Sequence, residues 1–443
     1  MIATDLAQEQ AFWQRIDGRM LYGGAERVQL LRAILAQLGH PEDHLKIVHL
    51  AGTNGKGSTG CLIASALRAQ GYRVGWFTSP ALQTPREQIV LDERLVTPTE
   101  ILTAVAQVKV ALAQLALDEC AVSAFEWSFL LAMVCFINAG ITWAVVETGL
   151  GGALDATNAI EHPSLVVFTP ISYDHMAILG DTLTAIATTK SAIMRPGVSV
   201  ISAPEQAAEV QAVLTQAAQA NATEVLTVTD AQLTWQAQTL TGSILNVQTA
   251  DFQWRALQIG LAGRYQGQNV LTALLALNQL PVTRTAIREG FAQAHLGGRL
   301  ALVQTQPVTI ADGAHNVAGA QALQASLDQL LPATQPRIYV VGILADKAYA
   351  KMLPWLTQHA SQVIVTTPAH PERALAAADL AATLHQEQPD LAVQVQPDPQ
   401  AALHQAQQLA GVNGAVIVTG SFYLLKAVGI WQHSGSPATM PIS

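Results

Sequence analysis

The sequence has 443 residues, of which half are hydrophobic and 12% are charged, and its formal net charge is −9. This composition excludes simple disorder, because disordered chains are poor in apolar residues. The acidic balance argues against a dedicated nucleic-acid-binding protein, which usually carries a basic face. The length predicts two or three domains.

Neither the cysteines nor the apolar segments indicate secretion or a membrane. Three scattered cysteines without zinc-ligand spacing predict a reducing compartment, so we expect a cytoplasmic protein. The first residues include acids and no apolar run, so we expect no signal peptide. The longest apolar stretch, 129–146, is interrupted by Asn-Ala-Gly at 138–140. This favours a buried helix and a buried strand over a membrane span, and we expect no membrane partner.

In the first half of the chain, short β-branched runs alternate with helical stretches. We predict helices at 58–70 and 125–138, and strands at 46–51, 73–77, 142–147, 165–169 and 198–202. Apolar strands in βαβα order predict a mainly parallel sheet with helices on both faces.

A second α/β series follows, with predicted strands at 307–311, 337–343, 362–367 and 415–420. Between the two series, residues 203–261 contain alternating stretches that indicate antiparallel β additions. A glycine pair at 297–298 separates a helix from the second series. We therefore predict two domains, 1–296 and 297–443.

The most informative motif is AGTNGKGST at 51–59, between a predicted strand and a predicted helix. Glycines let backbone N–H groups converge on an anion, and the helix N-terminus adds partial positive charge. Lys56 can reach terminal phosphates, and Ser58 or Thr59 can offer a hydroxyl to Mg²⁺. The alternative is a glycine-rich turn that only packs.

The loop departs from the common phosphate-loop pattern, because Gly57 separates Lys56 from Ser58. This variant, GTNGKGST preceded by VHLA, resembles the nucleotide loop of folylpolyglutamate and dihydrofolate synthases in the Mur ligase superfamily. Further segments resemble the same family in the same order: 24–42, 76–91, 145–160, 168–193, 262–277, 297–303, 311–316 and 419–425. The resemblance implies an α/β fold with a P-loop N-terminal domain and a smaller Rossmann-like C-terminal ligase domain.

The resemblance implies that ATP is bound between the two domains, where sites are common. The residues that it assigns to ATP are Gly52, Thr53, Asn54, Gly55, Lys56, Gly57, Ser58, Thr59, Asn269, Arg299, Asp312 and His315.

A metal site is expected beside the loop. Glu147 ends an apolar strand, where a carboxylate can hold Mg²⁺ or its water, although a surface acid is the alternative. The resemblance adds Ser58, Ser79 and His175 as ligands of two Mg²⁺ ions and allows a monovalent cation. It also implies catalytic roles for Lys56, His175 and Lys190. Lys190 would be carbamylated, whereas the sequence alone indicates only a lysine on a helix surface.

The implied reaction is ATP-dependent ligation of L-glutamate to a folate through an acyl phosphate. Arg86 and Asp155 are the expected substrate-binding residues, with the pterin in an apolar cleft near 79–91 and 149–158. The chain departs from the family pattern at Ala153, Thr189 and Ala192, which weakens the expected charge scaffold.

Two alternatives stay open at this point. One is dihydrofolate synthase activity, alone or combined with folate polyglutamylation, because the same acyl phosphate chemistry serves both. The other is a non-catalytic ATP-binding paralogue. We expect a monomer with small-molecule partners, namely folate, L-glutamate and ATP.

Overall fold

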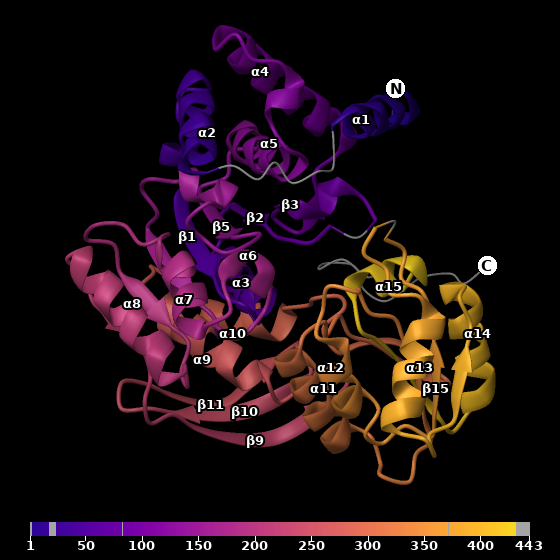
Figure 1. Ribbon diagram of the computed structural model, residues 1–443. Coiled ribbons are helices and arrows are strands. Elements are labelled where there is room, and N and C mark those ends of the chain that lie inside the picture. The colour runs from indigo at the N-terminus through magenta and orange to yellow at the C-terminus, as the bar shows by residue number, and fades with distance from the viewer. Residues whose placement is uncertain (1, 17–23, 82, 371, 431–443) are drawn as a thin grey trace. The chain divides into compact units, whose positions relative to one another are not determined.

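The computed structural model describes residues 2–16, 24–81, 83–370 and 372–430 (Figure 1). Contacts divide the chain into two compact units. Unit 1 comprises Met1–Ala231 and Gln268–Phe291, and unit 2 comprises Gln232–Gly267 and Ala292–Ser443.

Within the described residues, unit 1 is built on an eight-stranded sheet in the order β4-β3-β2-β5-β1-β6-β7-β8. The strands β2, β5, β1, β6, β7 and β8 pair in parallel, and β3 and β4 add antiparallel pairs at the β2 edge. Their bounds are β1 Lys46–Ala51, β2 Val74–Phe77, β3 Ile89–Leu91, β4 Arg94–Leu95, β5 Trp143–Glu147, β6 Leu165–Phe168, β7 Val200–Ser202 and β8 Val225–Leu226.

Helices of unit 1 connect these strands and supply much of its core. The α-helices are α1 Ile2–Arg15, α2 Ala25–Gln37, α3 Lys56–Ala69, α4 Pro98–Gln114, α5 Ala124–Asn138, α6 Met176–Leu179, α7 Leu183–Ser191 and α8 Ala208–Ala220, followed by α9 Gln266–Leu277 and α10 Arg284–Gln293. Short 3₁₀ helices are η1 Pro41–His44, η2 Pro85–Gln88, η3 Glu119–Ala121 and η4 Ala156–Ala159. The apolar stretch 129–146 is the buried part of α5 followed by β5, as predicted. No described helix is both long and apolar enough to cross a bilayer.

Unit 2 contains two sheets within the described residues. One is antiparallel: β9 Gln232–Thr239, β10 Gly242–Gln248 and β11 Gln253–Ile259. The other has the order β12-β13-β17-β14-β15-β16, parallel apart from β12. Its strands are β12 Ala301–Thr305, β13 Val308–Ala311, β14 Arg337–Val341, β15 Gln362–Val365, β16 Val393–Val395 and β17 Ala415–Thr419. Its helices are α11 Val317–Leu330, α12 Tyr349–Leu356, α13 Ala377–Glu387, α14 Pro399–Ala410 and α15 Phe422–Ala427.

The predicted fold class is confirmed: a large, mainly parallel sheet domain precedes a second α/β unit. One pairing in the predicted antiparallel segment is wrong, because β8 pairs in parallel with β7. The helix α8 connects these two strands, and a helical crossover leads to parallel pairing. The three cysteines, all described, form no disulfide.

The contact grouping differs from the predicted division at 296/297 in two segments, since 232–267 and 292–296 belong with unit 2. Leu240 packs against the apolar core of unit 2, and a Cβ at Gly260 would lie 2.4 Å from the Ala294 carbonyl oxygen. A ligase-domain boundary at 296/297 stays a proposal for the point where the second parallel sheet begins.

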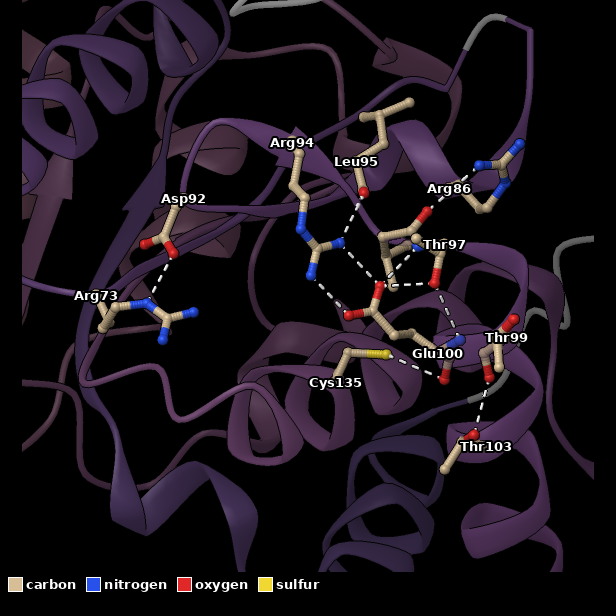
Figure 2. Close-up of polar contacts among 11 residues, drawn as sticks. Arg73, Arg86, Asp92, Arg94, Leu95, Thr97, Thr99, Glu100, Thr103 and Cys135 are labelled. Carbon is tan, nitrogen blue, oxygen red and sulfur yellow. Dashed lines mark hydrogen bonds and ion pairs between the residues drawn. The ribbon is translucent and has the colours of Figure 1, made fainter. Parts of the chain in front are cut away.

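A polar network fixes the start of α4 in unit 1 (Figure 2). Thr97 caps the helix, and its backbone N–H donates to Glu100 Oε2 over 2.8 Å. Arg94 donates to both oxygens of Glu100, at 2.9 and 2.7 Å. A bidentate ion pair between Arg94 and Glu100 therefore joins strand β4 to the capping box of α4.

Glu100→Gln should lower the free energy of unfolding by about 1 kcal/mol near neutral pH, since solvent screens this half-exposed pair. The Arg94 hydrogen bonds are the largest cause that lowers the pKa of Glu100, from 4.5 to about 2. A carboxyl whose folded pKa is lowered stabilises the fold above its unfolded pKa and loses this contribution in acid. Urea unfolding should therefore show the difference shrinking as the pH falls from about 4.5 towards 2.

The matched control is Glu93→Gln, because the Glu93 side chain is 68% exposed and lies 3.7 Å from Arg68. This control should change stability less than Glu100→Gln. An undiminished effect of Glu100→Gln in strong acid would contradict the assignment.

Candidate active site

The phosphate loop connects β1 to α3 and requires glycine at two positions. Gly52 and Gly55 have φ angles of 153° and 88°, and Gly55 is the N-cap of α3. A Cβ would lie 1.9 Å from Thr169 Oγ1 at Gly52 and 2.3 Å from Asn269 Oδ1 at Gly55. At these two positions the backbone passes too close to its neighbours for a side chain. The loop leads into the N-terminus of a 14-residue helix, a place where anions bind readily.

Two of the predicted ATP-binding residues hold the loop in place. The backbone N–H groups of Thr53 and Asn54 donate to the Pro170 carbonyl at 2.9 and 3.2 Å. The Thr53 hydroxyl donates to the Ser172 carbonyl at 2.9 Å, and Asn54 Nδ2 donates to Ser172 Oγ at 3.3 Å. These contacts tie the loop to the segment that follows β6.

Two lysines converge on one carbonyl of the loop. Lys56 Nζ and Lys190 Nζ donate to the Gly52 oxygen over 2.8 and 2.9 Å. Lys190 is 4% exposed, and burial is the main cause that lowers its pKa to about 7, with the nearby Lys56 charge adding to it. The sequence alone indicated a surface position for Lys190, which is wrong, because the C-terminal end of α7 is buried.

The predicted metal ligands follow the carboxyl ends of neighbouring parallel strands. Ser79 follows β2, Glu147 ends β5, Ser58 lies on α3 after β1, and His175 follows β6. In an open parallel sheet, ligands bind at this edge. Glu147 is 1% exposed, so the alternative of a surface acid is excluded.

Glu147 lies against the beginning of α3, near Gly60. Its Oε1 accepts a hydrogen bond from Trp76 Nε1 at 2.9 Å, and a Cβ at Gly60 would lie 3.3 Å from the same oxygen. A buried carboxylate, with serines on the segments that follow β1 and β2, supplies the kind of oxygen ligand that Mg²⁺ prefers. The donor set therefore fits a metal whose remaining ligands are phosphate oxygens and water.

His175 is more exposed than Ser58 and Glu147, which are both buried. Its side chain is 33% exposed, its φ is 49°, and its Nε2 lies 3.9 Å from Asp174 Oδ2. Among the described residues, the group of three metal-capable side chains within 4.8 Å of one another is His40, Glu42 and Asp43, not the predicted set. Of the predicted ligands, Glu147 and His175 are side chains of this carboxylate or imidazole type. A full coordination shell for the metal therefore needs further oxygen ligands.

Asp155, an expected substrate residue, is committed to hydrogen bonds within its own loop. It is 5% exposed and accepts from the Leu150 N–H at 2.8 Å, the Thr157 N–H at 3.0 Å and the Thr157 hydroxyl at 2.6 Å. Burial raises the pKa of Asp155, and these hydrogen bonds oppose that shift. This carboxylate organises the loop that follows β5.

Arg86, the other expected substrate residue, is held by α1. Its Nε lies 3.1 Å from Glu9 Oε2. Its Nη1 donates to the Val96 carbonyl at 3.3 Å, and Figure 2 shows this contact from the Arg86 side chain. Glu9 is 1% exposed, and burial raises its pKa overall, although the charge of Arg86 opposes part of this shift. Sequence reasoning missed Glu9, since nothing in the spacing of α1 indicates a partner for Arg86.

The remaining predicted ATP residues fall into both units. Asn269 belongs to unit 1, and its Oδ1 lies 3.5 Å from Thr59 Oγ1. Arg299, Asp312 and His315 belong to unit 2. Asp312 accepts from the Leu300 and Ala314 N–H groups, each at 2.8 Å, and burial raises its pKa against the opposing charge of Arg299.

An aromatic ring that sequence reasoning did not single out joins this second group. The guanidinium carbon of Arg299 lies 4.3 Å from the centre of the Phe422 ring, and the His315 ring centre lies 5.8 Å from it. A Cβ at Gly313 would lie 2.3 Å from Phe422, so the tight DGAHN turn also depends on this ring. The segment around Phe422 resembles the family, but the resemblance assigns this ring no role.

Comparison with known proteins identifies both halves of the chain. Residues 50–277 match the Mur ligase middle domain, and residues 298–422 match the glutamate ligase domain of Mur ligases. The folylpolyglutamate synthase of Lacticaseibacillus casei is 34% identical over 408 residues, which cover 89% of this chain and 92% of that protein.

Solved structures of the same kind superpose on nearly the whole chain. A Mycobacterium tuberculosis folylpolyglutamate synthase, complexed with ADP and AMPPCP, has a TM-score of 0.85 and 27% identity, covering 96% of this chain and 98% of that one. A bifunctional folylpolyglutamate synthase/dihydrofolate synthase from Yersinia pestis, complexed with AMPPNP and a Mn ion, has a TM-score of 0.81 and 28% identity, covering 96% and 97%. By sequence and by fold, this chain belongs to the folylpolyglutamate synthase and dihydrofolate synthase family of Mur ligases.

Proposed function

We propose that this protein ligates L-glutamate to a folate at the expense of ATP. The observation that carries the proposal is the convergence of Lys56 and Lys190 on the Gly52 carbonyl, in a phosphate loop beside the buried Glu147. This arrangement supports phosphoryl transfer, which depends mainly on positioning and on neutralising charge. The complexes of relatives with ATP analogues and Mn support ATP and a divalent metal as its partners.

The reaction has two steps. An oxygen of the folate carboxylate attacks the γ-phosphorus of ATP, which gives an acyl phosphate and releases ADP. The amine of glutamate then attacks the acyl carbon, the C–O bond to phosphate breaks, and the amine loses a proton. Lys56 would hold the transferred phosphate through its positive charge.

The divalent metal, when bound, neutralises phosphate charge and polarises the phosphoryl group. Of this chain's residues, Glu147 and the hydroxyls of Ser58 and Ser79 would hold it, together with His175. A carbamate on Lys190 would add a second carboxylate-like ligand, and a monovalent cation stays a further expectation. A cytoplasmic location, supported by the cysteine pattern, and a monomeric state are further parts of the proposal.

The experiment that tests the proposal measures ADP release with tetrahydrofolate or with dihydropteroate, each with and without L-glutamate. Glutamate-dependent release with tetrahydrofolate is the expected result. Release with dihydropteroate as well would assign both activities, as in the bifunctional Yersinia relative. No glutamate-dependent release with either substrate would favour a non-catalytic paralogue.

Arg299→Ala should raise KM for ATP by about 10–100-fold, because a charge-assisted contact to phosphate is lost. The Phe422 ring holds the guanidinium in place, so lysine should replace Arg299 poorly. Steady-state kinetics at varied ATP measures the effect. Arg255→Ala is the matched control, since Arg255 is an exposed residue on β11 of the same unit. Equal KM values for Arg299→Ala and Arg255→Ala would remove Arg299 from the ATP site.

A further inference from the structure

A buried histidine on β1 lies three residues before the phosphate loop. His49 is fully buried, and β1 is paired with β5 on one side and β6 on the other. Its Nε2 lies 2.8 Å from the hydroxyl of Thr157, on η4. The residues proposed above for ATP, metal and substrate do not include His49.

The direction of this hydrogen bond follows from the other contact of Thr157. The Thr157 hydroxyl has one hydrogen, and its oxygen lies 2.6 Å from Asp155 Oδ1. Asp155 also accepts backbone N–H groups, which suits its ionised form, so it accepts the hydroxyl hydrogen too. Nε2 must therefore carry a hydrogen and donate it to Thr157. Among the described atoms, the buried Nδ1 of His49 has no hydrogen-bond partner.

The imidazole is neutral in this arrangement. Burial is the main cause that lowers the pKa of His49 to about 3, and the positive charge of Arg195 lowers it further. His49 therefore donates one hydrogen bond, from Nε2 to Thr157, because only the neutral tautomer with its hydrogen on Nε2 fits these contacts.

The loop that this network holds packs directly on the end of α7 that carries Lys190. The Ala153 N–H donates to the Thr189 carbonyl at 2.8 Å. A Cβ at Gly152 would lie 2.6 Å from the Thr189 oxygen and 2.9 Å from Lys190 Cα. A shift of Asp155 would therefore move the backbone that positions Lys190.

We propose that His49 is a positioning residue, a neutral Nε2–H donor that holds Thr157 and Asp155 in place. Through the loop that follows β5, these two residues fix the position of Lys190 at the end of α7. The inference rests on the proposed function for its kinetic readout only. The hydrogen bonds of His49, Thr157 and Asp155 connect β1, which leads into the phosphate loop, to the loop that follows β5. None of these three side chains binds ATP or metal in the proposal above.

The test compares variants that remove the network with variants that keep it. His49→Leu and Thr157→Val remove the donor and the hydroxyl, and each should lower kcat by about tenfold with KM for ATP unchanged. Because both break the same network, the double variant should be no slower than the slower single variant. His49→Gln places an amide N–H near the position of Nε2, and Thr157→Ser keeps the hydroxyl, so both should retain most of kcat.

Two results would overturn the proposal. One is a double variant whose loss is the product of the single losses, and the other is a His49→Gln variant as slow as His49→Leu. Binding of an ATP analogue to each variant, measured by calorimetry, shows that the fold persists.

A second measurement does not depend on turnover. Nitrogen NMR of the ¹⁵N-histidine-labelled protein, with His49→Gln to assign the signal, should show His49 with a bare Nδ1 and a protonated Nε2 throughout the mildly acidic to neutral range. A protonated Nδ1 would overturn the proposal even in an active enzyme. Should the protein ligate no glutamate, the proposed function fails while this result stands by itself.

Discussion

Replacing Lys56 with alanine is expected to lower kcat for glutamate ligation by about 10²–10³-fold while the protein stays folded. Lys56 is the first residue of α3, and its ammonium group lies 2.8 Å from the Gly52 carbonyl, within the loop that would receive the phosphates. The side chain is half-buried and is not part of an apolar core, so its loss leaves no large cavity. Single-turnover assays at saturating ATP separate this chemical effect from weaker binding.

Two matched variants sharpen this test. Lys46→Ala removes a lysine from the opposite end of β1, where its ammonium lies 5.4 Å from the Trp143 ring centre, and turnover should be unchanged. Lys56→Arg keeps the charge but changes its shape, so it should recover part of the loss. Near-native turnover by Lys56→Ala would show that the loop assignment is wrong.

The alternation of apolar runs and helical stretches was sufficient to predict the main sheet. Strand β1 has the predicted bounds, and β2, β5 and β6 each lie within one residue of them. These strands are buried on both faces, so their sequences are mainly apolar, which is a strong local signal. The parallel pairing of β8 was missed because pairing direction depends on the α8 crossover, which the alternating pattern at 222–229 does not reveal.

The candidate site could be predicted where its residues lie in one short segment. The glycines, lysine and hydroxyls of the phosphate loop are consecutive, so their spacing alone indicated an anion site. The contacts of Trp76 with Glu147 and of Glu9 with Arg86 join residues far apart in the sequence. Such pairs depend on tertiary packing, so local patterns in a single sequence could not reveal them.

Lys190→Ala is expected to lower kcat by at least about 10²-fold, because we propose that a carbamate on Lys190 helps to hold a metal. A bare ammonium beside Mg²⁺ would repel it, and carbamylation reverses the charge. The step joins the neutral amine to CO₂ through a new N–C bond and releases one proton. Burial lowers the pKa of Lys190 to about 7, so the neutral amine becomes abundant as the pH rises through that value. Enzyme stripped of CO₂ should therefore respond more strongly to added bicarbonate above neutral pH than below it.

Chemical rescue distinguishes the carbamate from a lysine that serves only through its amine. A short carboxylate in the buffer, such as acetate, should restore part of the activity of Lys190→Ala, because it supplies the missing oxygen ligands. The same acid should not help Lys56→Ala, in which a cation is missing and an added anion would compete for the phosphate site. Carbon NMR with ¹³CO₂ should show a carbamate signal in the wild-type protein that Lys190→Ala lacks. Equal rescue of both variants, or no carbamate signal in active enzyme, would mean that Lys190 acts as an amine, held against the Gly52 carbonyl by its hydrogen bond of 2.9 Å.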